Sequence, residues 1–570
     1  MGSYSVHFEV YVRKISGAPW SLHLATEDRA AALKGAQELM AEGRVAAAKV
    51  TKETLDQESG EYRALEILKL GAAEVVAKSR PQVEAQPLCV TPQDLYTPHA
   101  RDRIGRLLEN WLNRNNATPF ELLHRPDLVE KLEASGADML HAVQKVAIPE
   151  AHARNKSVQE LIRYFQALVD RTVDRLMKDA AKGQLPDIDQ EGFAATAERL
   201  SSEAERGYLL GAGVAASIAS ATTWSDKVKR LLDLADSAPR QGPARGLALM
   251  TVQQPLAEIL ENKPGMVNIV GEGRDLGANL AAMTRLAAYD AVDRLMKVEN
   301  SVAKVMPELS PLALRLAMWL GGETFLDTRA AIGRRILREL TGGRRLRPGD
   351  AAGEIDVLRA LGMSLTAAAG KLLPLEDVQA AFTARSKMLV TGDFVEAYLG
   401  QKMTACEEIA ALIWLTENII GASNKRLAGG WLRASVSALR FQKEMESSEE
   451  TPATRLARLA GLQRSAARCG LVAEDFEPIR EKLGQIGGEI ESRARLTQNL
   501  AKADAPVLQR LTLLLKLASG ETAPLGPAAN RAKAEAIKLV KQNEVRSELA
   551  AAPQRVEAFR DLIQQAGLAA

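Results

Sequence analysis

The residues that could act as acids, bases or nucleophiles are spread unevenly along this chain. All six histidines lie within the first 152 residues. A serine or cysteine nucleophile needs a neighbouring base, most often histidine. A Ser/His or Cys/His pair is therefore excluded from residues 153–570, and we interpret Cys406 and Cys469 as small core side chains. No catalytic residue is assigned from the sequence.

Glu121 and His124 have the Glu-x-x-His spacing that carboxylate-bridged di-iron bundles use. Such a bundle needs the motif twice, with two further glutamates facing inward, and the motif occurs once here. The segment Thr118-Pro119-Phe120-Glu121 also fits a capping box with proline at the first helical position. We therefore interpret Glu121 as a helix cap, and we expect neither a metal site nor a cofactor.

A glycine-rich loop contains Gly271, Gly273 and Gly277 and precedes a predicted helix. Free backbone amides at a helix N-terminus can hold a phosphate. However, the Gly-x-Gly-x-x-x-Gly spacing differs from the dinucleotide fingerprint, and no βαβ pattern surrounds it. The loop is interpreted as a connector.

An arginine-rich segment is the first binding candidate. Its candidate ligand-binding or partner-binding residues are Arg334, Arg335, Arg344 and Arg345. The first two fall at the end of a predicted helix and the other two in the loop that follows. Arginines near a helix C-terminus are also favoured by the helix dipole, which is the structural alternative to anion binding.

A second basic segment offers Arg426, Arg433 and Arg440 at intervals of seven residues, with Trp431 among them. These arginines share one helix face if the two glycines between them do not interrupt the helix. A row of guanidinium groups beside an aromatic ring can hold phosphates, bases or an acidic partner helix. The glutamates of residues 444–450 follow at once and could neutralise the row internally.

Strict alternation of apolar and polar residues over 4–13 predicts a half-buried strand. A second strand is expected at 20–25, a helix up to about residue 43, and further strands at 45–51 and 62–70. The N-terminal part of the chain is thus predicted to be a small ββαββ domain of the α+β class.

Beyond this domain the pattern is helical. Only 4% of the residues are aromatic, and alanine, leucine, arginine and glutamate, which favour helices, dominate. Residues 231–244 and 514–528 share paired leucines followed by Ala-Pro and Gly-Pro-Ala, which predicts a helical hairpin in each place. We expect a mainly α fold with a large multi-helical body of stacked hairpins or bundles. Chance matches among leucine-rich helices are the alternative to a true repeat.

A chain of 570 residues exceeds what one hydrophobic core usually organises. A proline-rich polar stretch suggests a linker after the first domain. The predicted divisions are an α+β domain at 1–72, a linker at 73–98 and helical domains at 99–265, 266–445 and 446–570.

The segment from Gly207 to Ser225 carries no charge over a length that could cross a bilayer. Small residues make up most of it, so we expect a buried helix and no membrane span. Three cysteines, far apart in sequence, suggest a reducing compartment and hence the cytoplasm. The alanine- and arginine-rich composition suggests a bacterial source.

A net charge of +2 lacks the global signature of a protein that wraps nucleic acid. The leading hypothesis is a non-enzymatic scaffold or adaptor that binds protein partners through a helical surface. One alternative is binding of RNA or an anionic ligand, such as a phosphate or nucleotide, through the arginine segments. The other is an enzyme whose site is assembled from distant Arg, Lys and carboxylate residues. The oligomeric state stays open.

Overall fold

A computed structural model describes residues 6–13, 20–55, 62–71, 89–400, 402–551 and 556–568. The chain is 72% helical, and its sheet lies within the first 71 residues, which confirms the predicted mainly α class with a small α+β domain. Two compact units divide the chain, one made of residues 1–88 with 149–157 and the other of residues 89–148 with 158–570. Each unit is described separately below.

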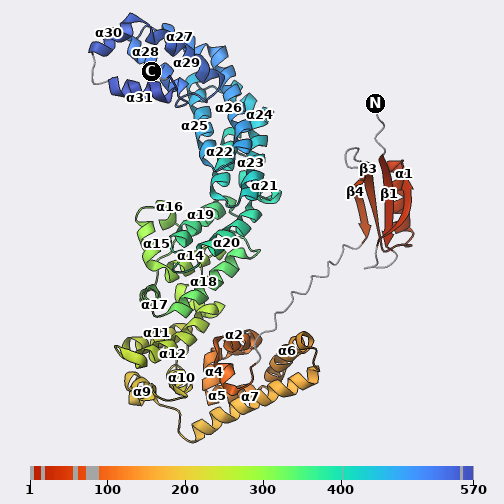
Figure 1. Cartoon of the computed structure of the whole chain (residues 1–570), viewed down its shortest axis with the longest axis vertical. Coiled ribbons are helices and arrows are strands. Elements are labelled where there is room, and N and C mark those ends of the chain that lie inside the picture. Colours follow the sequence, from red (N-terminus) through yellow and green to blue (C-terminus); the bar gives the residue numbers. More distant parts are fainter. Residues whose placement is uncertain are drawn as a thin grey trace. The chain divides into compact units, whose positions relative to one another are not determined.

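The N-terminal unit contains a four-stranded antiparallel sheet in the order β2-β1-β3-β4 (Figure 1). Its elements are β1 (Val6–Arg13), β2 (Ser21–Thr26), α1 (Arg29–Ala41), β3 (Ala47–Leu55) and β4 (Tyr62–Gly71). The ββαββ order agrees with the prediction, although β3 begins later and runs further than residues 45–51.

Helix α1 packs on one face of this sheet. Val10 and Val50 lie opposite each other on β1 and β3, and both are fully buried. Ala32 and Ala36 of α1 are also fully buried, and their small size lets the helix approach the strands closely. Successive side chains on a strand point to opposite faces. The residues that alternate with these valines along β1 and β3 therefore form the opposite face of the sheet.

The second unit begins with the short 3₁₀ helix η1 (Pro92–Tyr96). Its first helices are α2 (Pro98–Leu107), α3 (Glu109–Arg114), α4 (Pro119–His124), α5 (Pro126–Ala134), α6 (Ala137–Arg154), whose residues from Pro149 onward are assigned to the first unit, α7 (Val158–Ala181), α8 (Ile188–Glu191), α9 (Phe193–Leu200), α10 (Arg206–Ser217), α11 (Trp224–Ser237), α12 (Gly242–Glu261) and α13 (Lys263–Val270). The middle helices are α14 (Leu276–Ala287), α15 (Tyr289–Met296), α16 (Asn300–Ala303), α17 (Pro311–Gly321), α18 (Leu326–Thr341), α19 (Ala351–Ala367), α20 (Leu375–Leu389) and α21 (Gly392–Leu399). The last are α22 (Ala405–Asn418), α23 (Ala422–Ser437), α24 (Leu439–Ser447), α25 (Pro452–Arg468), α26 (Ala473–Ala494), α27 (Leu496–Lys502), α28 (Val507–Ala518), α29 (Pro527–Val540), α30 (Asn543–Ala551) and α31 (Val556–Gln565).

Neighbouring helices in this unit pair as hairpins, as Figure 1 shows for α11 with α12 and α28 with α29. These two pairs are the segments that share the leucine pattern in the sequence. Leu231 and Leu232 of α11, like Leu514 and Leu515 of α28, are fully buried. One apolar core runs from Phe120 to Ala566, across both boundaries expected between helical domains, so the divisions inside the body remain predictions.

Part of the predicted linker is ordered against the helical unit. The Asp94 carboxylate accepts hydrogen bonds from the backbone amides of Val90 and Thr91, both at 2.8 Å. The Tyr164 hydroxyl on α7 donates to the Cys89 carbonyl at 3.0 Å. Residues 89–98 thus belong with the helices, whereas residues 73–88 of the predicted linker lie outside the described residues.

The uncharged stretch 207–225 is divided between α10, a turn and the start of α11. Gly211 and Gly213 of α10 are buried in helix contacts, as the small residues of this segment predicted. A Cβ on Gly211 would lie 2.6 Å from Nε2 of His124, and one on Gly213 would lie 2.6 Å from the side chain of Ile188. None of the described helices has both the length and the apolar character that a membrane crossing requires.

Candidate functional site

The first arginine segment begins on α18, where Arg334 and Arg335 have different environments. Arg334 is exposed and donates to the Glu261 carboxylate at 2.9 Å. Arg335 is only 6% exposed and donates to the carbonyl oxygens of residues 260, 261 and 262 at 3.2, 3.1 and 2.9 Å. These carbonyls end α12, so Arg335 caps the C-terminus of a neighbouring helix.

Arg344 and Arg345, in the loop after α18, also have partners within the unit. Arg344 forms an ion pair with Glu339. The guanidinium of Arg345 lies 3.3 Å from the Glu354 carboxylate and 4.6 Å from the centre of the Phe394 ring. Each of the four predicted residues of this segment therefore has an internal partner.

The contact made by Arg335 recurs along the helical unit. The last four carbonyls of a helix lack intrahelical partners, and a cation near them is favoured by the helix dipole. Side chains that donate to carbonyls at the C-terminal end of another helix are Arg329, Arg335, Arg385, Lys425, Arg455 and Arg510. Much of the basic character of the sequence is thus used to join helices.

The second arginine segment is divided between two helices. Helix α23 continues through its two glycines and carries Arg426, Trp431 and Arg433, all exposed. It ends at Ser437, so Arg440 lies on α24, where it pairs with Glu408 at 3.2 Å. The structure therefore keeps Arg426 and Arg433 on one helix and separates Arg440 from them.

The exposed side of α23 has two different flanks. Residues advance about 100° each around a helix, which places Arg426 and Arg433 on one flank and Leu427 and Trp431 on the other. Leu427 is 54% exposed and Trp431 is 42% exposed. In the described part of the chain, neither Arg426 nor Arg433 has a hydrogen bond or an ion pair. Sequence reasoning missed Leu427, because its spacing of four from Trp431 does not reveal which side of the helix faces solvent.

The glutamates that follow this segment do not neutralise Arg426 and Arg433. The Glu444 carboxylate accepts hydrogen bonds from the backbone amides of residues 405 and 406 at 2.6 and 3.2 Å, and so caps α22. Glu446 pairs with Arg493 at 3.2 Å, and Glu450 pairs with Arg458. Glu444, Glu446 and Glu450 of the acidic run are therefore occupied by other partners.

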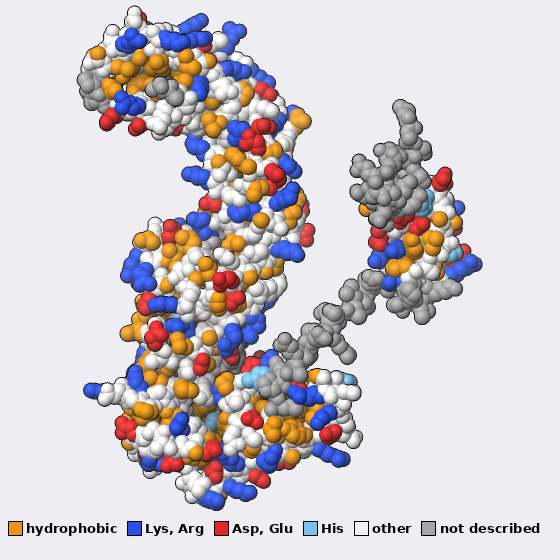
Figure 2. Space-filling view, viewed as in Figure 1, with side chains coloured by type: hydrophobic (Ala, Val, Ile, Leu, Met, Phe, Trp, Pro, Cys, Tyr) orange, Lys and Arg blue, Asp and Glu red, His pale blue; other side chains and the backbone are white. Residues whose placement is uncertain are grey.

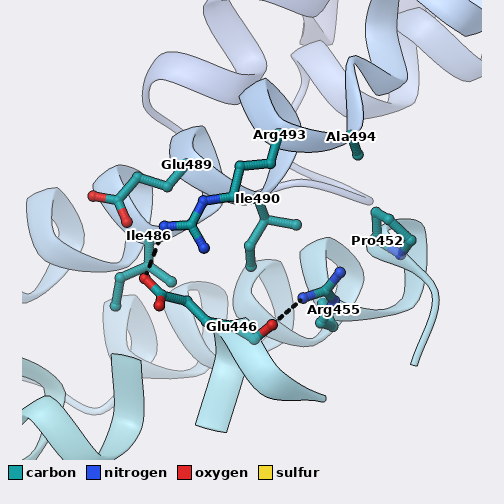
Figure 3. Close-up of a pocket in the computed structure, with 8 residues that line it drawn as sticks. All are labelled: Glu446, Pro452, Arg455, Ile486, Glu489, Ile490, Arg493 and Ala494. Atoms are coloured by element: carbon teal, nitrogen blue, oxygen red, sulfur yellow. Dashed lines mark hydrogen bonds and ion pairs between the residues drawn. The ribbon is translucent and has the colours of Figure 1, made fainter. Parts of the chain in front are cut away.

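A pocket of about 240 Å³ lies between α24, α25 and α26 (Figure 3). Figure 3 shows the Arg493 guanidinium directed at the Glu446 carboxylate, while Arg455 reaches the Glu446 carbonyl, 3.3 Å away. Hydrogen bonds from Gln442 and Arg493 hold the pKa of Glu446 below its usual range. Two of the four charged residues that line this pocket, Glu446 and Arg493, are thus already paired with each other.

A second cavity, of about 300 Å³, is lined by residues of α2, α3, α12 and α18. Its innermost pair is Arg101 and Glu258, with 2.7 Å between the guanidinium and the carboxylate. Arg101 also donates to the Gln254 side chain at 2.6 Å, and Glu258 accepts from the Phe120 amide at 2.8 Å. The polar groups in its depth are therefore satisfied by the protein itself.

Glu121 forms the capping box that the sequence predicts. Its carboxylate accepts from the Thr118 amide at 3.0 Å, and the Thr118 hydroxyl accepts from the Glu121 amide at 3.1 Å. The Lys227 ammonium lies 2.7 Å from the same carboxylate and also donates to the Asn116 carbonyl. Burial lowers the pKa of Lys227. Arg125 adds a further contact to Glu121, at 3.1 Å. Glu121 is thus part of a buried ion pair.

His124 is enclosed by aromatic rings. Its Nδ1 lies 2.8 Å from the Phe120 carbonyl, and its ring centre lies 5.0 Å from that of Tyr96 and 5.9 Å from that of Tyr208. Burial lowers the pKa of His124 to about 4, so the imidazole is neutral at neutral pH. The ring acts as a packing element between α4 and α10.

The glycine loop before α14 is held by its own chain. The Asp275 carboxylate accepts from the amide of residue 278 at 2.7 Å, and the Asn279 side chain accepts from the Gly273 amide at 2.9 Å. The Gly277 amide donates to the Leu346 carbonyl at 2.9 Å. These contacts occupy amides that a phosphate would need, which supports the connector interpretation.

The described residues contain no group of three or more His, Cys, Asp and Glu side chains that could hold a metal ion. Cys406 and Cys469 are buried, as expected for core residues, and burial raises the pKa of the Cys406 thiol to about 11. Acidic and basic side chains are interspersed over the face of the helical unit that Figure 2 shows. Comparisons of the chain with protein-family models, curated proteins and solved structures find no match.

Proposed function

We propose that this chain is a non-enzymatic scaffold or adaptor whose helical unit binds a protein partner on the exposed side of α23. The observation that carries the proposal is that a basic flank and an exposed apolar flank lie next to each other on that helix. Arg426 and Arg433 lack partners in the described structure, and Leu427 and Trp431 are exposed beside them. Tryptophan and arginine are enriched among the residues that contribute most to protein interfaces.

The chemistry of these flanks favours an acidic, amphipathic helix as the partner. Arg426 and Arg433 are seven residues apart, which is about 10.5 Å along a helix axis. Carboxylates two turns apart on a partner helix would match that separation. Leu427 and Trp431 would pack on its apolar stripe. The residues between the flanks, Ser423, Gly430 and Ala434, are small and allow a helix to approach closely.

Two other functions receive less support. Binding of RNA or an anionic ligand through the first arginine segment would compete with the internal contacts of Arg334, Arg335, Arg344 and Arg345. An enzyme assembled from distant groups would need unpaired charges in a cavity, whereas the buried pair Arg101–Glu258 is satisfied.

The unpaired state of Cys89, Cys406 and Cys469 supports a reducing compartment such as the cytoplasm.

The test uses the full chain and a fluorescein-labelled, helical peptide with leucines on one face and glutamates on the flanks. We expect saturable binding in fluorescence anisotropy and none for the same peptide with lysines in place of the glutamates. Trp431→Ala should weaken binding by at least about 2 kcal/mol, or roughly 30-fold. The double variant Arg426→Glu/Arg433→Glu should abolish binding at low salt.

The matched control is Arg294→Glu/Lys304→Glu, which changes the net charge equally at exposed positions elsewhere on the helical unit. It should bind the acidic peptide like the unmodified protein. Arg440 is left intact, because its reversal would leave Glu408 beside a like charge. Equal loss in both double variants, or no loss in either, would contradict the proposed surface.

A further inference from the structure

The face of the N-terminal sheet that α1 does not cover carries a cluster of cations around two aromatic rings. The cluster consists of Tyr11, Arg13, Trp20, Lys49 and Lys69. The Arg13 guanidinium lies 4.4 Å from the centre of the Trp20 ring. The Lys49 ammonium lies 5.2 Å from that ring and 5.0 Å from the Tyr11 ring, and the Lys69 ammonium lies 6.0 Å from Trp20. We call this cluster the basic sheet face.

The strand register fixes the basic sheet face. Tyr11 on β1 lies directly opposite Lys49 on β3, and Lys49 lies directly opposite Lys69 on β4. Like charges opposite each other on neighbouring strands destabilise a sheet. Neither lysine has a carboxylate partner among the residues that the structure describes. Two unneutralised ammonium groups side by side favour an anion bound across the strands.

The carboxylates of this face lie further along the strands. Glu9 is two residues from Tyr11 and accepts a hydrogen bond from its hydroxyl at 2.5 Å. The same carboxylate lies 3.2 Å from Nε2 of His7. Glu53 and Glu66 occupy the corresponding end of β3 and β4. The sheet face is therefore divided into a basic end, which holds the tryptophan, and an acidic end.

We propose that the basic sheet face binds a single strand of nucleic acid. Bases stack on aromatic side chains whatever their sequence, and cations along the path neutralise the phosphates. Open four-stranded sheets that bind RNA stack two or three bases on their exposed aromatics. The basic end of this sheet offers Trp20 and Tyr11 for stacking, and Arg13, Lys49 and Lys69 for phosphates.

A single strand fits this face better than other anions. Bases in a duplex are stacked on one another and cannot lie on Trp20, so a duplex would contact the cations alone. An acidic peptide without aromatic residues supplies carboxylates but no flat ring to stack on the indole. Rings and cations read bases and phosphates rather than the sugar, so RNA and DNA strands should bind with similar affinity. This site shares no residue with the surface proposed on α23.

The experiment measures anisotropy of fluorescein-labelled decauridine and decathymidine with the full chain. Both strands should bind, and a duplex of equal length should bind at least about tenfold more weakly. Trp20→Ala should weaken single-strand binding about tenfold or more, and Trp20→Phe should restore much of the loss. The double variant Lys49→Gln/Lys69→Gln should reduce the slope of log affinity against log salt by about 1.4.

Two controls keep the result specific. Lys34→Gln removes an exposed cation from α1, on the covered side of the sheet, and should bind like the unmodified chain. Arg426→Glu/Arg433→Glu should leave strand binding unchanged, because it alters the other proposed surface. The proposal is overturned if neither strand binds, if the lysine variant retains full affinity and salt dependence, or if a polyglutamate peptide binds as tightly as the strands.

Discussion

Lys227 is a buried cation that joins two helices distant in sequence. Its side chain is 2% exposed, and its ammonium reaches from α11 to the Glu121 carboxylate on α4. Taking charges out of water is costly, and the pair is sustained because each polar atom finds a partner. The same carboxylate caps its own helix through Thr118. The glutamate of the Glu-x-x-His motif, which resembles a metal-binding motif in the sequence, thus belongs to an ion pair that joins two helices.

Removal of one partner tests this joint. Lys227→Ala leaves the Glu121 carboxylate buried without its main counter-charge, so the free energy of unfolding should fall by about 3–5 kcal/mol. Urea denaturation followed by circular dichroism measures the change. Lys229→Ala, on the same helix but exposed, should change stability by less than about 0.5 kcal/mol. If the two variants are equally stable, the pair contributes nothing to the fold.

At the scale of helices, the close packing of α10 against its neighbours depends on glycines. Gly211 lies directly against the His124 imidazole, and that ring is fixed by its hydrogen bond to the Phe120 carbonyl. The added methyl group of Gly211→Ala should therefore destabilise the chain by about 1–3 kcal/mol through overpacking. Thermal melting detects the loss.

Gly207→Ala in the same helix is the matched control. A Cβ there would meet no atom within 4 Å, so alanine should be tolerated or add up to about 1 kcal/mol through its better helix propensity. A melting temperature for Gly211→Ala as high as that of the control would show that α10 can move away from α4.

The beginnings of several helices could be predicted from local sequence. Thr118, Ser310 and Thr451 each precede a proline, and each caps a helix that begins at that proline. The end of α23 could not be predicted, because no glycine or proline marks Ser437 as its last residue. For this reason the seven-residue spacing predicted Arg440 on the same helix face as Arg426 and Arg433. Local capping chemistry is visible in a sequence, whereas the packing that ends a helix is not.

At the scale of the whole chain, the order of two strands, a helix and two strands followed by helical hairpins could be predicted, because each element has its own periodicity. The candidate binding residues could be predicted only in part. Arg335 and Arg426 look alike in sequence, yet one caps α12 and the other faces solvent. The difference depends on which carbonyls and carboxylates the fold brings near. Lys49 and Lys69 were missed because their opposition is created by strand register.

Limited proteolysis tests the division into two units. The proline-rich polar sequence between Lys78 and Leu88 predicts an accessible backbone, so trypsin should cleave first after Lys78. Cleavage after Arg101 should be much slower, because that side chain is 4% exposed within α2. The released helical fragment should keep the melting temperature of the intact protein, since residues 89–96 hold to α7 through the Tyr164–Cys89 contact. Simultaneous cleavage after Lys78 and after Arg101 would contradict the predicted linker.

The arginines that donate to carbonyls at helix ends influence how much sequence change the helical unit tolerates. The acceptor in such a joint is backbone, as for Arg385, which donates to the carbonyls of residues 339, 340 and 344. Every helix offers carbonyls at its C-terminus, whatever its side chains are. Only the donor residue is constrained, so the sequence on the acceptor side is free to drift. Hairpins joined in this way can keep one architecture while the residues around their joints lose all resemblance.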